Sequence, residues 1–230
     1  MSLPSLLDEI LATPTDDASL EAAQQRSLQA SMAGRRQAVH SWEIGLPIAE
    51  ELRATLAGDP DEALSLHVSL NAWERGDVCL ALYEARCPAP SFRAFLEETW
   101  NHCHGGLMAA VARECAWWPD LLIAALFEYA DFPTPDHLPE QFTIWRGTNG
   151  IDIDEAVEGY CWTLNRDTAV WFSERFATAE RRPLVVAAEV ERREVWTYIN
   201  VNGEEEIVLP GVDVDRAWVD TDAIPKAATA

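Results

Sequence analysis

The sequence has almost no lysine and no long hydrophobic run. Lys226 is its one lysine, and 39 acidic residues against 17 basic ones give a formal net charge of −22 over 230 residues. Because a surface of this sign repels phosphate backbones, the composition disfavours a nucleic-acid partner. The most apolar stretch, residues 121–127, is interrupted by Glu128 and is shorter than a membrane span. We therefore expect neither nucleic acid nor a membrane as a partner.

The N-terminal residues are not expected to form a secretory leader, and the cysteines have no regular spacing. Asp8 and Glu9 interrupt the apolar residues at the N-terminus, and no basic segment precedes them. The five cysteines follow no framework spacing, and an odd number favours free thiols in a reducing compartment. These features predict a cytoplasmic protein, while export by a non-classical route would leave no mark in the sequence.

Motifs for metal binding and for a Rossmann-type dinucleotide site are missing as well. His102, Cys103 and His104 lie together, but no CxxC or HExxH motif accompanies them. Histidines just before a Gly-Gly pair are explained more simply by a favourable interaction with a helix C-terminus. No metal is expected. The absence of a glycine-rich phosphate loop disfavours an NAD-dependent dehydrogenase.

Residues 1–140 are predicted to be helical. They are rich in Ala, Leu and Glu, with apolar residues at three- and four-residue spacing. Proline and glycine pairs divide them into helical segments at residues 18–33, 42–57, 60–84, 90–104 and 107–130. Packing between helices is the simplest interpretation of their tryptophans, which are Trp42, Trp73, Trp100, Trp117 and Trp118.

After the proline-rich residues 132–139 the sequence becomes typical of strands. β-Branched and aromatic residues predict strands at 142–145, 184–190, 194–200 and 207–209, with a helix at 167–176. We therefore expect a helical region at residues 1–140, a mixed region at 141–220 and a frayed tail at 221–230. This pattern predicts an α+β fold. The tryptophan-rich helices favour packing of the helical region on the sheet, although two separate domains stay an alternative.

Three short elements in the mixed region carry polar side chains. Arg146-Gly147 ends a predicted strand, Cys161-Trp162-Thr163 precedes a helix, and Glu204-Glu205-Glu206 leads into an Ile-Val-Leu strand. Taken singly, they suit a surface ion pair, a helix cap and a solvated turn. A solvated turn explains the third element less well, because at least one of its glutamates must begin the strand. Burial of an unpaired carboxylate at that position is costly.

Taken in order, these elements resemble the ADP-ribosyltransferase superfamily, in the branch with an Arg, Ser-Thr-Ser and Glu-x-Glu signature. Arg146-Gly147 matches the first motif, Cys161-Trp162-Thr163 replaces Ser-Thr-Ser, and Glu204-x-Glu206 with the following Ile-Val-Leu-Pro matches the third. Asn165 and Ala169 stand at the family's offsets, as does Phe172. The resemblance covers residues 141–211 and implies a split β-sheet core, but it leaves residues 1–140 unexplained.

The resemblance implies an enzyme that breaks the bond between nicotinamide and ribose in NAD. That reaction passes through a ribose cation, which Glu206 would stabilise while bound to the 2′-hydroxyl. Arg146 would bind the pyrophosphate, and the backbone of Gly147 would bind the nicotinamide carboxamide. Thr163 would orient Glu206. An aromatic wall for the nicotinamide would come from Trp171 or Phe172.

Glu204 decides the acceptor in this interpretation. In the family, a glutamate at this position accompanies transfer to arginine, so the resemblance implies mono-ADP-ribosylation of a protein arginine by a bacterial or phage-borne toxin or modifier. Three alternatives stay open: an NAD glycohydrolase, a degenerate member that binds without catalysis, and a helical region that acts as an interaction module. Cys161 favours the degenerate member, since a thiol is a weak hydrogen-bonding group where the family has serine.

Overall fold

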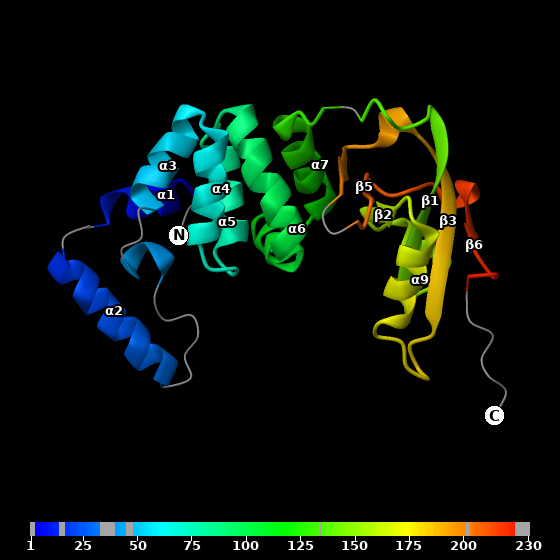
Figure 1. The fold of residues 1–230 in the computed structure, drawn as a ribbon, viewed down its shortest axis with the longest axis horizontal. Helices are drawn as coiled ribbons and strands as arrows, with labels where there is room; N and C mark the ends of the chain where they lie inside the picture. The colour runs from blue at the N-terminus through cyan, green and yellow to red at the C-terminus, as the bar shows by residue number, and fades with distance from the viewer. Residues whose placement is uncertain are drawn as a thin grey trace. The chain divides into compact units, whose positions relative to one another are not determined.

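The computed structural model describes residues 3–13, 17–32, 40–44, 48–133, 135–200 and 203–223. The chain divides into two compact units, Met1–Asp131 and Phe132–Ala230. The first unit is helical and the second contains an antiparallel sheet of six strands, which confirms the predicted α+β class (Figure 1). Most of the tail that was predicted to fray, from residue 224 onward, lies outside the described residues.

The described part of the first unit consists of α-helices and one short 3-10 helix, η1 (Ser41–Ile44). The α-helices are α1 (Leu3–Ala12), α2 (Asp17–Met32), α3 (Ile48–Ala57), α4 (Pro60–Ser69), α5 (Arg75–Glu84), α6 (Ala89–Glu114) and α7 (Pro119–Ala130). Asp59 begins α4 by accepting hydrogen bonds from the amides of Asp61 and Glu62. None of these helices is long and apolar enough to cross a membrane.

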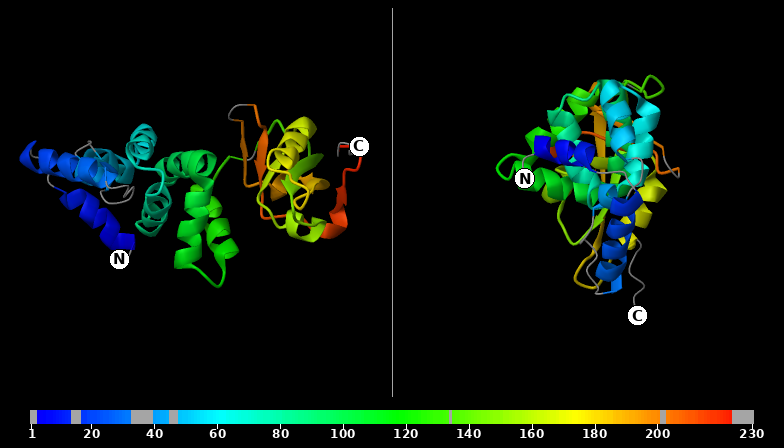
Figure 2. Two further views of the ribbon diagram at one scale, coloured as in Figure 1. Left: turned by 90° about the horizontal axis from the view of Figure 1, so that it is seen from below. Right: turned by 90° about the vertical axis from the view of Figure 1, so that its left-hand side faces the viewer.

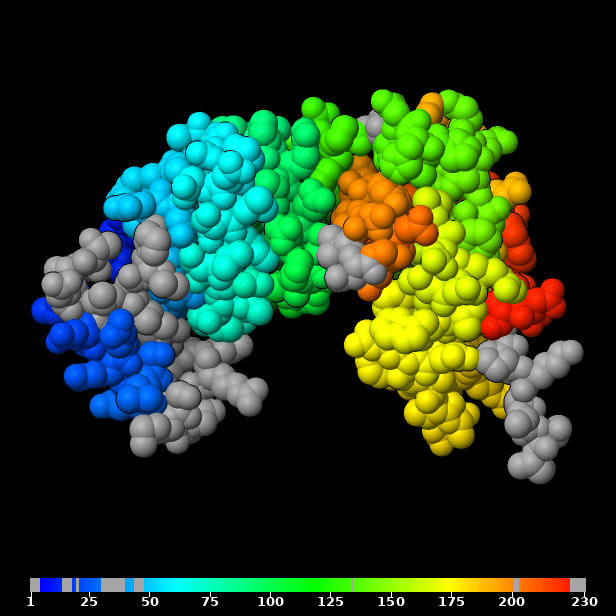
Figure 3. Space-filling view, viewed as in Figure 1, coloured from blue at the N-terminus to red at the C-terminus, as the bar shows by residue number. Residues whose placement is uncertain are grey.

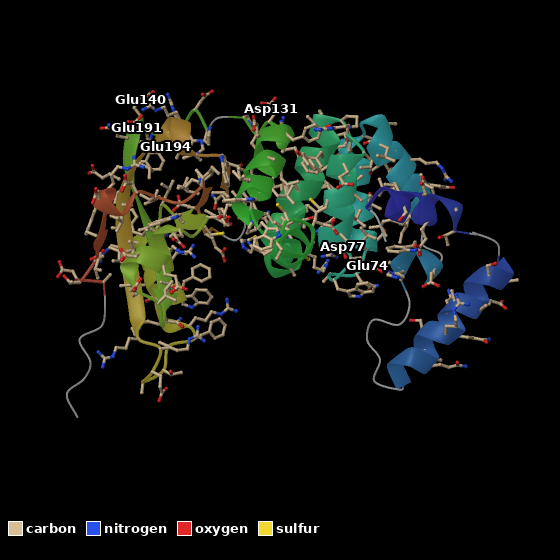
Figure 4. All side chains as sticks on the ribbon, turned by 180° about the vertical axis from the view of Figure 1, so that it is seen from behind. Glu74, Asp77, Asp131, Glu140, Glu191 and Glu194 are labelled. Atoms are coloured by element: carbon tan, nitrogen blue, oxygen red, sulfur yellow. The ribbon has the colours of Figure 1, made fainter. Side chains whose placement is uncertain are left out.

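A buried carboxylate joins η1 to α5 and interrupts the helix predicted at residues 60–84. Glu74 accepts hydrogen bonds from His40 Nδ1 at 3.0 Å and from the amides of Ser41 and Asn71 at 2.9 Å each (Figure 4). The Ser41 hydroxyl donates to the same carboxylate. These partners can bind the buried carboxylate only because residues 70–74 leave the helical path. The segment predicted as one helix at residues 60–84 is therefore two helices, α4 and α5.

The helix break predicted at Gly105-Gly106 occurs two residues earlier, at Cys103, whose φ of −140° and ψ of 28° are non-helical and kink α6. The chain is helical again through both glycines to Glu114. A Cβ on Gly76 of α5 would lie 2.5 Å from the carbonyl oxygen of Gly106, so the small residues allow close packing of α5 on α6. Gly76 and Gly106 therefore allow close contact between the two helices, whereas a side chain at Gly105 would meet open space.

The prediction that all five tryptophans pack between helices is wrong for two of them. Trp42 and Trp100 are buried and Trp73 is half-buried. Trp117 and Trp118 are 89% and 67% exposed, because they lie in the turn between α6 and α7, where the chain has left the helix face.

The second unit is built on one sheet with the strand order β4-β5-β2-β1-β3-β6. Its strands are β1 (Gln141–Asn149), β2 (Cys161–Thr163), β3 (Pro183–Glu191), β4 (Thr197–Ile199), β5 (Glu206–Val208) and β6 (Ala217–Val219). Two helices, α8 (Ile153–Val157) and α9 (Arg166–Glu174), lie between β1 and β3 in the sequence. Strands were predicted at β1, β3, β4 and β5, whereas α8 and β6 carry too little apolar periodicity to be predicted.

The two faces of the sheet have separate apolar clusters. One face packs Ile144, Trp162 and Ile207 with residues 156–157 of α8. The other packs Val185 against Ala169 of α9, and α9 runs along β1 on this face (Figure 2). The side chain of Asn165 caps α9 by accepting hydrogen bonds from the amides of residues 167 and 168.

Helix α9 lies so close to β1 that residue 147 has no room for a side chain. A Cβ on Gly147 would lie 1.7 Å from the carbonyl oxygen of Ala169 and 2.8 Å from the amide nitrogen of Ser173. Because both atoms belong to the backbone, we expect Gly147→Ala to lower the free energy of unfolding by about 3 kcal/mol in urea denaturation. Gly105→Ala is the control, since its Cβ would meet nothing within 4 Å. Equal stability of the two variants would contradict this explanation.

Candidate functional site

The sheet brings the three sequence motifs onto neighbouring strands. Strand β2 lies between β1 and β5. Thr163 stands opposite Trp145 of β1 on one side and opposite Glu206 of β5 on the other. Arg146, Thr163 and Glu206 therefore come from three adjacent strands although they are far apart in the sequence.

The pairing of β1 with β2 is much shorter than its pairing with β3. Nine residue pairs join β1 to β3, whereas a single pair, Trp145 with Thr163, joins β1 to β2 in the described residues. The bond from the Gly150 amide to Arg182 shows that the even-numbered residues of β1 direct their main-chain groups to β3. The N–H and C=O of Gly147 therefore point to the β2 side, beyond the last ladder pair. We call these two groups the open edge of β1.

The Arg146 guanidinium lies where the ladder between β1 and β2 stops. Its Nη1 donates to the main-chain carbonyl of Cys161 at 2.5 Å. Its Nε is buried and has no hydrogen-bond partner among the described residues. Burial lowers the pKa of Arg146, and the neighbouring Cys161 and Glu206 oppose that shift. A buried cation with an unpaired donor is costly unless an anion binds to it.

The side chains of the three motifs do not all start from the same face. Direction alternates along a strand, so Arg146 leaves β1 on the face of Ile144 and Trp162. Thr163 pairs with Trp145, and Glu206 pairs with Thr163, so both side chains lie on the face of α9. The structure thus brings Thr163 and Glu206 together, while the Arg146 guanidinium reaches β2 from the other face at the Cys161 carbonyl.

The glutamate loop is fixed to β2 through its main chain. The Thr163 hydroxyl donates to the carbonyl of Glu204 at 2.6 Å, and the amide of Leu164 donates to the carbonyl of Glu205 at 3.0 Å. Glu205 adopts a left-handed conformation with φ 48°, which turns the chain into β5. Thr163 therefore fixes the main chain of the glutamate loop that leads into β5.

The glutamates of this loop are all half-buried, as predicted for a carboxylate at the start of a strand. Glu204 precedes β5 and Glu206 begins it. The segment that carries β4 and β5 and the segment that carries α9 are both visible on one face of the second unit (Figure 3). Because Glu206 pairs with Thr163, its side chain leaves β5 on the α9 face.

The two aromatic residues of α9 occupy different sides of the helix. Trp171 is 52% exposed, on the side away from the buried Ala169, and the Arg175 guanidinium lies 4.8 Å from its ring centre. Phe172 is half-buried, with its ring centre 4.9 Å from that of Trp171. Of the two predicted candidates for a nicotinamide wall, Phe172 is therefore the one on the flank of α9 nearer the sheet.

Gly159 is a site residue that the sequence analysis missed. It precedes β2, and its Cα lies against the Arg146 guanidinium, as described below. A glycine just after a short helix is ordinarily interpreted as a helix stop, so the sequence offers no signal for this contact.

The cluster around His102 has ordinary partners. His102 pairs with Glu98 at 3.3 Å, and Arg75 Nη1 lies 3.3 Å from Cys103 Sγ. Among the described residues, no three His, Cys, Asp or Glu side chains are grouped so that they could hold a metal ion.

Comparison of the chain with protein-family models, curated proteins and solved structures finds no match. The function is therefore inferred from the geometry of the second unit and from the motifs it brings together.

Proposed function

We propose that this chain binds NAD at the open edge of β1 and transfers ADP-ribose to an arginine side chain of a protein. The observation that carries the proposal is that three features lie on neighbouring strands, with Arg146 reaching β2 from the face opposite to that of Glu206. They are the outward N–H and C=O of Gly147, the buried unpaired Nε of Arg146, and the half-buried carboxylate of Glu206 on the strand next to β2.

The open edge suits the nicotinamide carboxamide. A carboxamide has one acceptor oxygen and two donor hydrogens, and a strand edge offers one donor and one acceptor side by side. Gly147 can bind such a group with the two main-chain groups that a longer β2 would otherwise occupy. Residue 147 must be glycine whichever ligand binds, because α9 leaves no room for a side chain there.

Arg146 suits the pyrophosphate. A chain of net charge −22 repels free anions, so an anionic substrate needs a local cation. The guanidinium supplies that charge, and its planar donors match phosphate oxygens. Pairing with phosphate would also satisfy the Nε that lacks a partner.

Glu206 acts on NAD, and Glu204 acts on the acceptor arginine. As the bond between C1′ of the ribose and the nicotinamide nitrogen breaks, its electron pair leaves with the neutral nicotinamide, and the Glu206 carboxylate stabilises the cation on the ribose. A guanidinium nitrogen of the acceptor then bonds to C1′ and gives its proton to Glu204. The resemblance implies that such an enzyme acts as a toxin or modifier.

Glu204→Ala is expected to preserve nicotinamide release and to reduce labelling of protein arginines by about 100-fold, because only the acceptor then lacks its base. The measurement follows nicotinamide and labelled protein after incubation of each variant with labelled NAD and a cell lysate. Glu205→Ala is the matched control from the same loop, and we expect it to label as the wild type does.

The same experiment separates the alternatives. Nicotinamide release by the wild type without any labelled protein would favour an NAD glycohydrolase. No release from any variant would contradict both enzymatic functions and favour a binding protein. Cys161 touches Arg146 through its main-chain carbonyl, so its replacement of serine leaves that contact intact.

A further inference from the structure

We infer that Gly159 is a positioning residue for Arg146, an inference that rests on the proposed NAD site. A Cβ on Gly159 would lie 2.1 Å from Cζ of Arg146, 2.3 Å from Nη2 and 2.6 Å from Nε. These three atoms belong to the guanidinium plane, so the plane lies against the bare Cα of Gly159. No residue other than glycine leaves that space.

The position of Gly159 is fixed relative to β2. The indole Nε1 of Trp162 donates to the carbonyl of Gly159 at 2.8 Å, and Trp162 itself is buried in the apolar cluster that includes Ile144. The amide of Gly159 donates to the carbonyl of Ala156 at the end of α8. Gly159 is therefore held from both sides, and it forms a rigid support on which the guanidinium rests.

Gly159 and the Cys161 carbonyl together hold the Arg146 guanidinium in place. The support blocks one side of the guanidinium, and the carbonyl of Cys161 binds Nη1 at 2.5 Å. Because the side chain is held by contact and by one hydrogen bond, its remaining donors keep a fixed direction. Such preorganisation lowers the entropic cost of binding a phosphate.

Gly159→Ala separates this role from a role in folding. The backbone of Gly159 does not adopt the left-handed conformation, since its φ is not among the positive values of the chain, so alanine fits the local backbone. The atoms that the methyl group would meet are the far end of a flexible side chain. The methyl group is therefore expected to displace the guanidinium while the sheet stays intact.

The test compares wild type, Gly159→Ala, Arg146→Gln and the double variant, each titrated calorimetrically with NAD. Gly159→Ala is expected to weaken NAD binding by about 10- to 100-fold and to raise KM, with little change in kcat. In the Arg146→Gln background the same methyl group is expected to change the affinity by less than about twofold, because the group that it displaces is already gone.

An NMR measurement of the Arg146 Nε–H resonance tests the positioning without any NAD. We expect this resonance to move in Gly159→Ala, and also in Trp162→Phe, which loses the indole donor to Gly159 but keeps a large aromatic ring. Trp162→Phe provides the second test if Gly159→Ala fails to fold.

The possible results distinguish the inference from the proposed function. Failure of the wild type to bind NAD would contradict the proposed function, and the NMR measurement would still decide the positioning role. An unchanged Arg146 resonance in both variants would overturn that role. So would a Gly159→Ala effect on NAD affinity that persists in full without Arg146, because the methyl group would then act by another route.

Discussion

Glu206→Gln is expected to slow nicotinamide release from NAD by two to three orders of magnitude, or about 3 to 4 kcal/mol of transition-state stabilisation. Glutamine keeps the size and hydrogen-bonding shape of glutamate but removes the negative charge that stabilises the ribose cation. Because that charge matters most in the transition state, kcat falls while the affinity for NAD changes little. Initial rates of nicotinamide release at several NAD concentrations give both quantities.

Glu205→Gln is the matched control for this variant. Glu205 precedes Glu206 in the same loop and is equally half-buried, but it lies outside β5. Glu205→Gln removes one negative charge from the loop, as Glu206→Gln does. An equal loss of kcat in both variants would show a general electrostatic effect and contradict a specific role for Glu206.

Acidification from pH 6.5 to pH 3 is expected to lower the free energy of unfolding by about 4 to 5 kcal/mol through His67 alone. This side chain is 2% exposed, and its Nε2 is buried without a partner among the described residues. Burial, with smaller contributions from Arg75 and His102, lowers the pKa of His67 from 6.5 to about 3. The unfolded chain therefore binds a proton first, so this contribution is complete above pH 6.5 and is lost as the pH falls towards 3.

The measurement is chemical denaturation of wild type and His67→Leu between pH 7 and pH 3. The leucine variant cannot bind the proton, so its stability is expected to fall less steeply with acid. At pH 7 the two proteins are expected to differ little, because a buried nitrogen without a partner contributes no hydrogen bond. His137→Leu is the control, since His137 is exposed and belongs to the second unit. Equal pH slopes for wild type and His67→Leu would contradict the pKa shift.

Local patterns in the sequence predicted the elements that depend on local interactions. The helix predicted at 167–176 corresponds to α9, and the long strands β1 and β3 contain the segments predicted at 142–145 and 184–190. The errors come from contacts between distant residues. The helix break lies at Cys103 rather than at Gly106, where Gly76 packs closely, and residues 70–74 leave the helix because Glu74 binds His40 and Ser41.

The candidate site shows the same contrast between local patterns, which the sequence reveals, and contacts between distant residues, which it does not. The order of Arg146, Thr163 and Glu206 was apparent in the sequence, and the sheet places them on adjacent strands. The register of β1 against β2 was not predictable, because one residue pair sets it, and that pair decides the face from which Arg146 approaches. The contact of Gly159 with Arg146 depends on the same register.

Titration of isotope-labelled Glu206→Gln with NAD, followed through the backbone amide of Gly147, tests the proposed site most directly, because this variant is expected to bind NAD and to consume it only slowly. A carboxamide at the open edge is expected to accept a hydrogen bond from this amide and shift its resonance, together with that of Arg146 Nε–H, while Gly105 in the helical unit stays unchanged. A Gly147 resonance that does not move at saturating NAD would contradict the proposed site.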